Sequence, residues 1–126
     1  MLVMVTSYEQ ELEAEASSVR TARRAVTDRL ADSVDDDQLD RIVLCTSEIV
    51  TNAIEHGAPP IELRIEHDDD TVRVEVCDTS PLLPRPSDPP PTSIRGRGLL
   101  IVEKCADGWG VEERAHGKVV WFELAV

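Results

Sequence analysis

A long amphipathic segment that stops abruptly constrains the fold of this chain more than any other feature. Between residues 39 and 54, apolar side chains recur at steps of three and four, which places them on one face of a helix. Gly57 then stands in the position that favours a left-handed backbone, and Pro59-Pro60 prevents the helix from continuing. The pattern predicts a long helix with one buried stripe. The acidic residues 35–37 suit its start, where carboxylates meet the positive end of the helix dipole.

Two alternating segments follow this helix and indicate a hairpin. Apolar and polar side chains alternate over residues 61–66 and again over 72–77, with a charged turn at 67–70. An antiparallel hairpin with one buried face fits this pattern, because alternate side chains of a strand point to opposite faces. Upstream, apolar spacing predicts a helix over residues 14–30, and residues 2–6 suit a short first strand.

The second half of the chain is irregular and then regular again. Residues 79–95 hold six of the eight prolines, which is typical of a lid, a binding loop or a disordered segment. A helix is predicted to start at Leu99, and a last hairpin to occupy residues 109–126. This order of elements predicts an α+β fold with helices on one face of a mixed, mostly antiparallel sheet. The length of residues 1–126 fits a single domain.

The charge of the chain excludes several classes of partner. Lys and Arg number 13 against 25 Asp and Glu, which gives a formal net charge of -12. Binding to nucleic acid or to an anionic membrane needs a basic face, so we expect neither. No apolar stretch reaches the ~20 residues that span a bilayer. The three cysteines, Cys45, Cys77 and Cys105, form no CxxC pair, which favours reduced thiols and a cytoplasmic location.

Glu48, Asn52 and His56 lie four residues apart along the border of the apolar stripe. A solvated helix face explains such a line, and so does a pocket into which all three side chains point. In a pocket, Asn52 offers an uncharged oxygen suited to Mg²⁺, and Glu48 can take a proton from an attacking hydroxyl or water. His56, at the helix end, either hydrogen-bonds a ligand or caps backbone carbonyls.

Asp78 continues the alternation of three valines at positions 72, 74 and 76, so its carboxylate is predicted to point into the core. A buried carboxylate costs several kcal/mol unless it has partners. Two alternatives remain open. Backbone amides at the strand end could satisfy it, or it could be an acceptor for a ligand donor such as the exocyclic amine of a purine.

Gly96, Arg97 and Gly98 stand directly before the helix that is predicted to start at Leu99. Glycines in this place let backbone amides approach an anion, and the helix N-terminus adds its positive dipole. Arg95 and Arg97 bring positive charge to this loop of an acidic chain. Together these features favour a phosphate site.

Three segments resemble the motifs of one family. Residues 48–57, Glu-Ile-Val-Thr-Asn-Ala-Ile-Glu-His-Gly, resemble the N box of the GHKL ATPases, which include gyrase and the histidine kinases. Residues 74–78 resemble their G1 box, and residues 96–99 their G2 box. The wider family has a glycine two residues after the G1 aspartate, and here Ser80-Pro81 replaces it and its neighbour. The resemblance is strongest to the anti-sigma-factor serine/threonine kinase branch and its stand-alone actinobacterial regulators.

The resemblance implies a Bergerat fold, a two-layer α/β sandwich that binds ATP·Mg²⁺ under a lid formed by about residues 79–95. It implies that Glu48 is the general base, that Asn52 coordinates Mg²⁺ and that Asp78 binds the adenine amine. The implied cofactor-binding residues are Asn52, His56, Asp78, Arg95, Gly96, Arg97, Gly98 and Leu99.

Two functions follow from this resemblance. A protein serine/threonine kinase would bind a sigma factor and phosphorylate an anti-sigma-factor antagonist with ATP. A non-catalytic switch would use ATP only to order the partner surface, and would sequester a sigma factor or another regulator. The intact set of Glu48, Asn52 and Asp78 argues against a third reading, an interaction module without nucleotide. Relatives often dimerise, so a homodimer is among the expected assemblies.

Overall fold

The computed structural model of the chain describes residues 5–81 and 97–126. Within them the chain forms three helices and five strands, in the order that the sequence predicted. The elements are β1 (Thr6–Leu12), α1 (Ser17–Leu30), α2 (Asp36–His56), β2 (Ile61–His67), β3 (Thr71–Asp78), α3 (Arg97–Cys105), β4 (Gly108–Arg114) and β5 (Gly117–Ala125). None of the described helices is long and apolar enough to cross a membrane.

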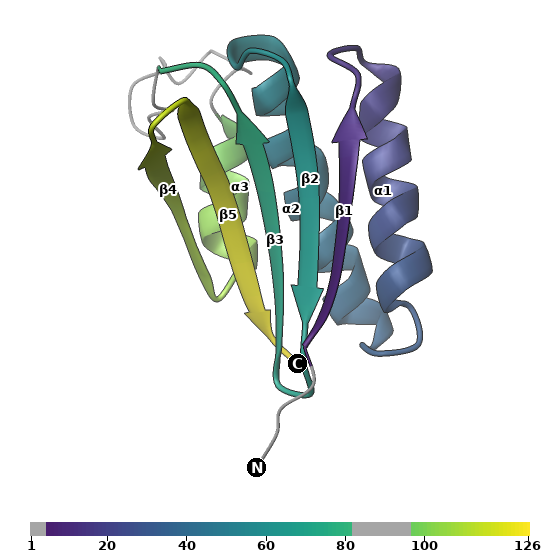
Figure 1. Ribbon diagram of the computed structural model, residues 1–126. Helices are drawn as coiled ribbons and strands as arrows, with labels where there is room; N and C mark the ends of the chain where they lie inside the picture. The colour runs from purple at the N-terminus through teal and green to yellow at the C-terminus, as the bar shows by residue number, and fades with distance from the viewer. Residues whose placement is uncertain (1–4, 82–96) are drawn as a thin grey trace.

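The five strands form one sheet in the spatial order β1-β2-β3-β5-β4. All four pairings between these described strands are antiparallel, so they include no parallel pair of the kind a mixed sheet would have. Figure 1 shows α1, α2 and α3 together behind the sheet. The predicted α+β fold, with one helical layer on a mostly antiparallel sheet, is confirmed.

The first strand lies further along the chain than its apolar residues indicated. It spans Thr6–Leu12 rather than residues 2–6, and α1 starts at Ser17 rather than near residue 14. β1 is an edge strand, and within it Leu12 alone is buried. Because most of its other residues are polar and exposed, hydrophobicity does not mark this strand. Residues 1–4 lie outside the described part of the chain.

The core lies between α2 and the inner face of the sheet. β2, β3 and β5 bury alternate residues against the helix stripe, and Leu63, Val74 and Phe122 are fully buried. Complete burial of such side chains contributes roughly 1.5–3 kcal/mol each. Cys45 belongs to the same layer, and burial raises the pKa of its thiol to about 12. It therefore packs as a small apolar side chain.

Asp35 fixes the start of α2 through a capping box. Its Oδ1 accepts a hydrogen bond from the backbone N–H of Gln38 at 2.8 Å, and Oε1 of Gln38 accepts from the backbone N–H of Asp35 at 2.9 Å. Asp36 and Asp37 add negative charge to the first turn. The acidic residues therefore begin the helix, as predicted.

Ion pairs cover the outer face of the sheet. Glu75, which is buried, lies 3.3 Å from Nη1 of Arg64 and 2.8 Å from Nε of Arg73. Arg73 also contacts Glu123 at 2.7 Å, and its Cζ lies 4.1 Å from the centroid of a Trp121 ring. Charged and aromatic side chains thus shield this face where a second helical layer is absent from the described residues.

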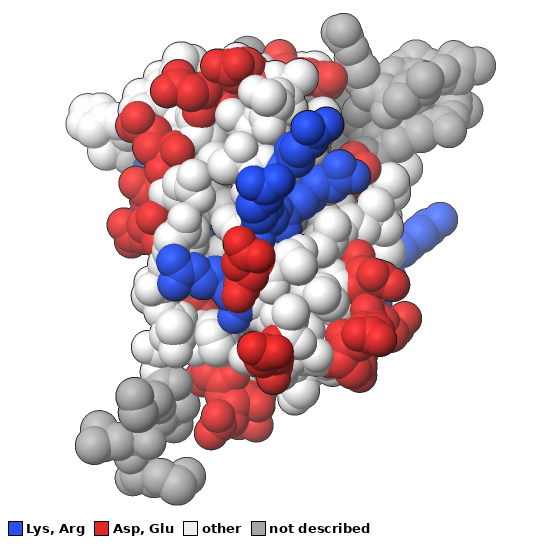
Figure 2. Space-filling model, turned by 90° about the vertical axis from the view of Figure 1, so that its right-hand side faces the viewer, with Lys and Arg blue, Asp and Glu red and all other residues white. Residues whose placement is uncertain are grey.

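One face of this acidic molecule carries a concentration of positive charge. Figure 2 shows Lys and Arg side chains gathered over α1, with acidic groups on either side. The exposed arginines of α1 are Arg20, Arg23, Arg24 and Arg29. Cζ of Arg29 also lies 3.9 Å from the centroid of the Tyr8 ring on β1. The exposed surface of α1 therefore carries more basic than acidic side chains, in contrast to the net charge of the chain.

Candidate functional site

Asp78 ends β3 and points into the molecule, as its place in the alternation predicted. It is 4% exposed. Its Oδ1 accepts hydrogen bonds from the backbone N–H of Ser80 at 2.8 Å and of Ala58 at 3.4 Å. The same oxygen lies 3.0 Å from Nζ of Lys118. One oxygen of the carboxylate is therefore held by two backbone amides and an ammonium group.

The second carboxylate oxygen of Asp78 has no such support. Oδ2 is buried and has no hydrogen-bond partner among the residues that the structure describes. Leaving a buried acceptor unpaired costs about 1–3 kcal/mol, and more when the group is charged. The two sequence alternatives therefore combine in one side chain. Oδ1 is satisfied structurally, whereas Oδ2 is available to a donor from a ligand.

Two glycines allow the backbone to close around Asp78. A Cβ on Gly57 would lie 2.7 Å from Cγ of Asp78 and 2.6 Å from the carbonyl oxygen of Ala53. Gly57 has φ −90° and ψ −167°, so the expected left-handed backbone is wrong and the requirement for glycine is steric. Gly117 does have a positive φ of +142°, and a Cβ there would overlap the carbonyl oxygen of Asp78.

The end of α2 is tied directly to the end of β3. The carbonyl oxygen of Ala58 accepts from the backbone N–H of Thr79 at 2.9 Å and from its hydroxyl at 3.2 Å. This joint brings the last turn of the helix to the carboxylate at the strand end. Of the residues of α2 that the sequence singled out, His56 in the last turn is therefore the one nearest along the chain to this joint.

Lys118 is the residue of this region that the sequence analysis missed. It is paired with Asp78 across β3 and β5, and it is 4% exposed. Lys118 shares the strand face of Val120 and Phe122, so the alternation argument that placed Asp78 inward also applies to it. The alternation of the strand therefore indicated that Lys118 points inward. It was missed because a lysine beside a glycine at the start of a strand is usually interpreted as solvated.

Glu48 and Asn52 lie half-buried on successive turns of α2. Burial raises the pKa of the Glu48 carboxyl, and the nearby carboxylate of Glu55 raises it further. His56 is exposed, and its Nε2 lies 3.7 Å from Oε2 of Glu55. Among the described residues no backbone carbonyl accepts a hydrogen bond from His56, so its predicted capping role has no support.

The predicted phosphate segment is described only in part. Arg95 and Gly96 lie outside the described residues, as does most of the predicted lid over residues 79–95. A helix follows as predicted, but α3 begins at Arg97, two residues before the predicted start at Leu99, so Arg97 and Gly98 belong to its first turn. Leu99 is 1% exposed and packs in the core, so its side chain is not open to a ligand.

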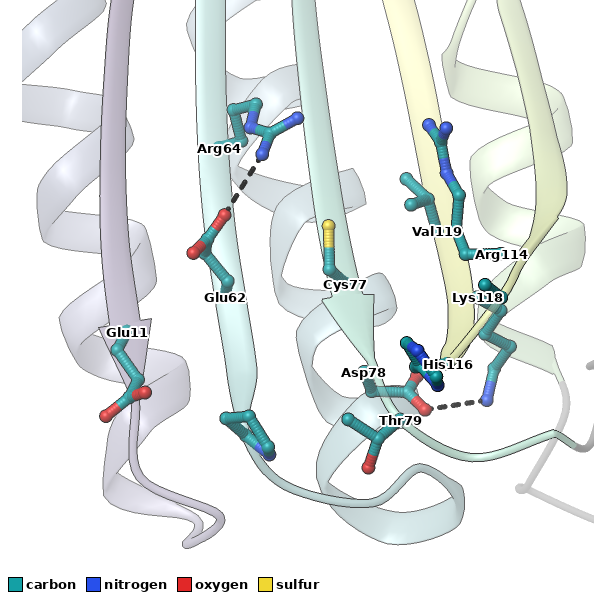
Figure 3. A pocket seen from close by; sticks show the side chains of 12 residues that line it. Glu11, Glu62, Arg64, Cys77, Asp78, Thr79, Arg114, His116, Lys118 and Val119 are labelled. Carbon is teal, nitrogen blue, oxygen red and sulfur yellow. Dashed lines mark hydrogen bonds and ion pairs between the residues drawn. The ribbon is translucent and has the colours of Figure 1, made fainter.

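A pocket of about 550 Å³ opens on the outer face of the sheet, where Glu62, Arg64 and Cys77 line it, and reaches Asp78 and Lys118 at the strand ends. Thr79, Arg114 and His116 also line it. Figure 3 shows the ion pair of Asp78 and Lys118 at one end of this pocket, with His116 beside it. The pair therefore lies between this outer pocket and the helix side of the sheet, where Gly57 contacts Asp78.

Within the described residues, no group of three or more His, Cys, Asp and Glu side chains could hold a metal ion. Mg²⁺ bound to a nucleotide commonly takes one or two protein ligands and completes its shell with phosphates and water. The half-buried amide of Asn52 fits such a single ligand.

A comparison with protein families identifies the class. The model of the histidine kinase-like ATPase domain matches residues 12–124, and the chain therefore belongs to that family. This confirms the resemblance drawn from the three motifs, which now fall on α2, at the end of β3 and at the start of α3. Membership implies a nucleotide-binding site. No curated protein matches the chain.

Two solved structures share the fold. The RsbU and RsbW domains of Rv1364c from Mycobacterium tuberculosis align with 24% identity and a TM-score of 0.73, over 94% of this chain and 32% of that one. The histidine kinase domain of the Erythrobacter litoralis EL346 blue-light activated histidine kinase aligns with 19% identity and a TM-score of 0.53, over 86% of this chain and 59% of that one. The chain thus spans 32% and 59% of these two proteins, and at such identities the likeness concerns the fold.

Proposed function

We propose that this protein binds ATP with Mg²⁺ and transfers the γ-phosphoryl group to a serine or threonine of an anti-sigma-factor antagonist. The observation that carries the nucleotide assignment is Oδ2 of Asp78, a buried acceptor without a partner among the described residues of an ATPase-family fold. The exocyclic amine of adenine is a donor that satisfies it.

The spacing along α2 supports an elongated ligand. Glu48 and Gly57 are nine residues apart, so at 1.5 Å per residue they are separated by about 13 Å along the axis. Because Gly57 lies against Asp78, a ligand bound there reaches Glu48 only if it extends along the helix. A nucleoside triphosphate has this shape, with its base at Asp78 and its phosphates toward Asn52 and Glu48.

Each residue of α2 then has one task. The amide oxygen of Asn52 would hold Mg²⁺, which when bound neutralises charge on the phosphates. Glu48 would take the proton of the attacking hydroxyl as its oxygen bonds to the γ-phosphorus and the bond to the bridging oxygen of ADP breaks. Burial and Glu55, which raise the pKa of Glu48, make it a stronger base than an exposed glutamate.

The proposed protein partners are a sigma factor and its antagonist. The family branch that the motifs resemble supports this assignment, as does the shared fold with a structure that contains an RsbW domain. The exposed arginines of α1 offer a surface for an acidic segment of such a partner, on a chain whose net charge of -12 would otherwise repel it.

The decisive experiment is transfer of labelled phosphate from ATP to candidate antagonists, with wild type and Glu48→Gln. Glutamine keeps the shape but not the proton acceptor, so transfer should fall by roughly 10²–10⁴ while ATP binding survives. Asp40→Asn, which changes an exposed carboxylate of the same helix, is the matched control and should retain transfer. If wild type transfers no phosphate and ATP still changes affinity for a partner, the protein is the nucleotide-gated switch instead.

A further inference from the structure

Lys118 has hydrogen-bonding capacity that its ion pair does not use. Its ammonium group has three N–H donors, and its side chain is 5% exposed. Among the described residues, Oδ1 of Asp78 is the acceptor recorded for it, at 3.0 Å. An ammonium group withdrawn from water needs further acceptors, because its unused donors have lost their hydration. The residue therefore has donors to offer to a ligand.

The donor of Lys118 and the free acceptor of Asp78 lie side by side. The two residues are direct partners across β3 and β5. Oδ1 joins them, and Oδ2 has no hydrogen-bond partner in the described part of the chain. Figure 3 shows both side chains at the same end of the pocket. Together, Asp78 and Lys118 present an acceptor beside a donor on two hydrogen-bonded neighbouring strands.

We propose that Lys118 is a second base-recognising residue, which donates a hydrogen bond to ring nitrogen N1 of adenine while Oδ2 of Asp78 accepts from the 6-amino group. This rests on the proposed nucleotide site. On the edge that carries the 6-amino group and N1, adenine presents a donor next to an acceptor. This is the complement of the acceptor on Asp78 and the donor on Lys118. Guanine presents a carbonyl oxygen and an N–H in the same places, so both contacts would be repulsive.

A purely structural role for Lys118 makes a different prediction. If Lys118 only neutralised Asp78, its removal would weaken all nucleotides by the same factor, whatever their ring atoms. If it contacts N1, its removal should matter only for bases that have an acceptor at that position. The nucleotide that separates the two roles is 1-deaza-ATP, in which a C–H replaces N1.

The test is calorimetric titration of the full chain with ATP and with 1-deaza-ATP, in wild type and in Lys118→Met. Wild type should bind 1-deaza-ATP roughly 10- to 100-fold more weakly than ATP, the value of one hydrogen bond from a charged donor. Lys118→Met should bind the two nucleotides equally. Purine riboside triphosphate, which lacks only the amine, is the matched control and should stay weaker than ATP in both proteins.

Each outcome decides the proposal. Equal binding of ATP and 1-deaza-ATP by wild type would overturn the role of Lys118 and leave the ATP site standing. A difference that persists unchanged in folded Lys118→Met would overturn it as well. If wild type binds no ATP, the proposed function fails and this inference fails with it. Should Lys118→Met not fold, the comparison of the two nucleotides on wild type decides alone.

Discussion

Gly57 and Asp78 are in contact so closely that the helix end and the strand end cannot both keep their places if a side chain is added. A Cβ on Gly57 would lie 2.8 Å from Oδ2, the oxygen that we assign to the adenine amine. The glycine therefore preserves the acceptor as well as the packing.

Gly57→Ala is expected to reduce the free energy of ATP binding by more than it reduces the free energy of unfolding. The added methyl group displaces the Asp78 carboxylate or the end of α2, and either shift removes the acceptor from its position. The matched control is Gly108→Ala, where the nearest atom to a new Cβ is 3.8 Å away, in Trp121. Titration with ATP and a thermal melt of each variant separate the two effects. Unchanged ATP affinity in Gly57→Ala would contradict the placement of the base.

Asp78→Asn should weaken ATP binding by about 1–3 kcal/mol, because the amide presents a donor or a weaker acceptor to the amine. GTP, which has a carbonyl in place of the amine, should lose much less. The asparagine oxygen can still accept from Lys118, but the buried ammonium group loses its counter-charge, so circular dichroism must first show that the variant is folded. Equal losses for the two nucleotides would reduce Asp78 to a structural residue.

Asn52→Ala should abolish the metal-dependent part of ATP binding. The acidic chain must offset the charge of a triphosphate, so wild type should bind ATP more tightly with Mg²⁺ than with EDTA. In the variant the two titrations should coincide. Wild type that binds ATP equally with and without Mg²⁺ would refute the role of Asn52.

The pH dependence of phosphoryl transfer should report Glu48. A general base must be ionised, so the rate should fall as the pH drops through the raised pKa of Glu48, at a higher pH than for an ordinary glutamate. If the rate instead falls at the ordinary pKa of glutamate, burial does not strengthen Glu48 as a base.

The raised pKa of Glu48 also means that its charged form is disfavoured in the folded protein. Glu48→Gln should therefore be slightly more stable than wild type at neutral pH, and the difference should vanish below the ordinary pKa of glutamate.

Glu75→Ala should lower the free energy of unfolding by roughly 1–3 kcal/mol, because two arginines on the outer face lose a buried acceptor. Glu112 contacts Arg73 at 3.6 Å with a side chain 45% exposed, so Glu112→Ala should cost less than about 1 kcal/mol. Urea denaturation of both variants measures the difference. Equal costs would show that burial of Glu75 adds nothing.

Sequence alone predicted the elements whose residues obey one strong periodicity. The stripe of α2 and the alternation of β2 and β3 placed their buried faces correctly, and the same alternation turned Asp78 inward. β1 was misplaced because an edge strand with one buried residue has little hydrophobic signal. The steric need for Gly57 and the pairing of Lys118 with Asp78 depend on tertiary contacts. Alternation could have turned Lys118 inward, but it does not show which residue lies opposite it on the neighbouring strand.

The continuity of α2 has a consequence for how this site can vary among related chains. Glu48, Asn52 and the contact at Gly57 belong to one uninterrupted helix and its end, so the distance from base to phosphate is fixed by a rigid rod. One residue inserted within that stretch would turn Glu48 by about 100° away from Asp78. Changes in length should therefore be confined to the connections between elements, whereas the interval from Glu48 to Gly57 should keep the same number of residues wherever the activity is kept.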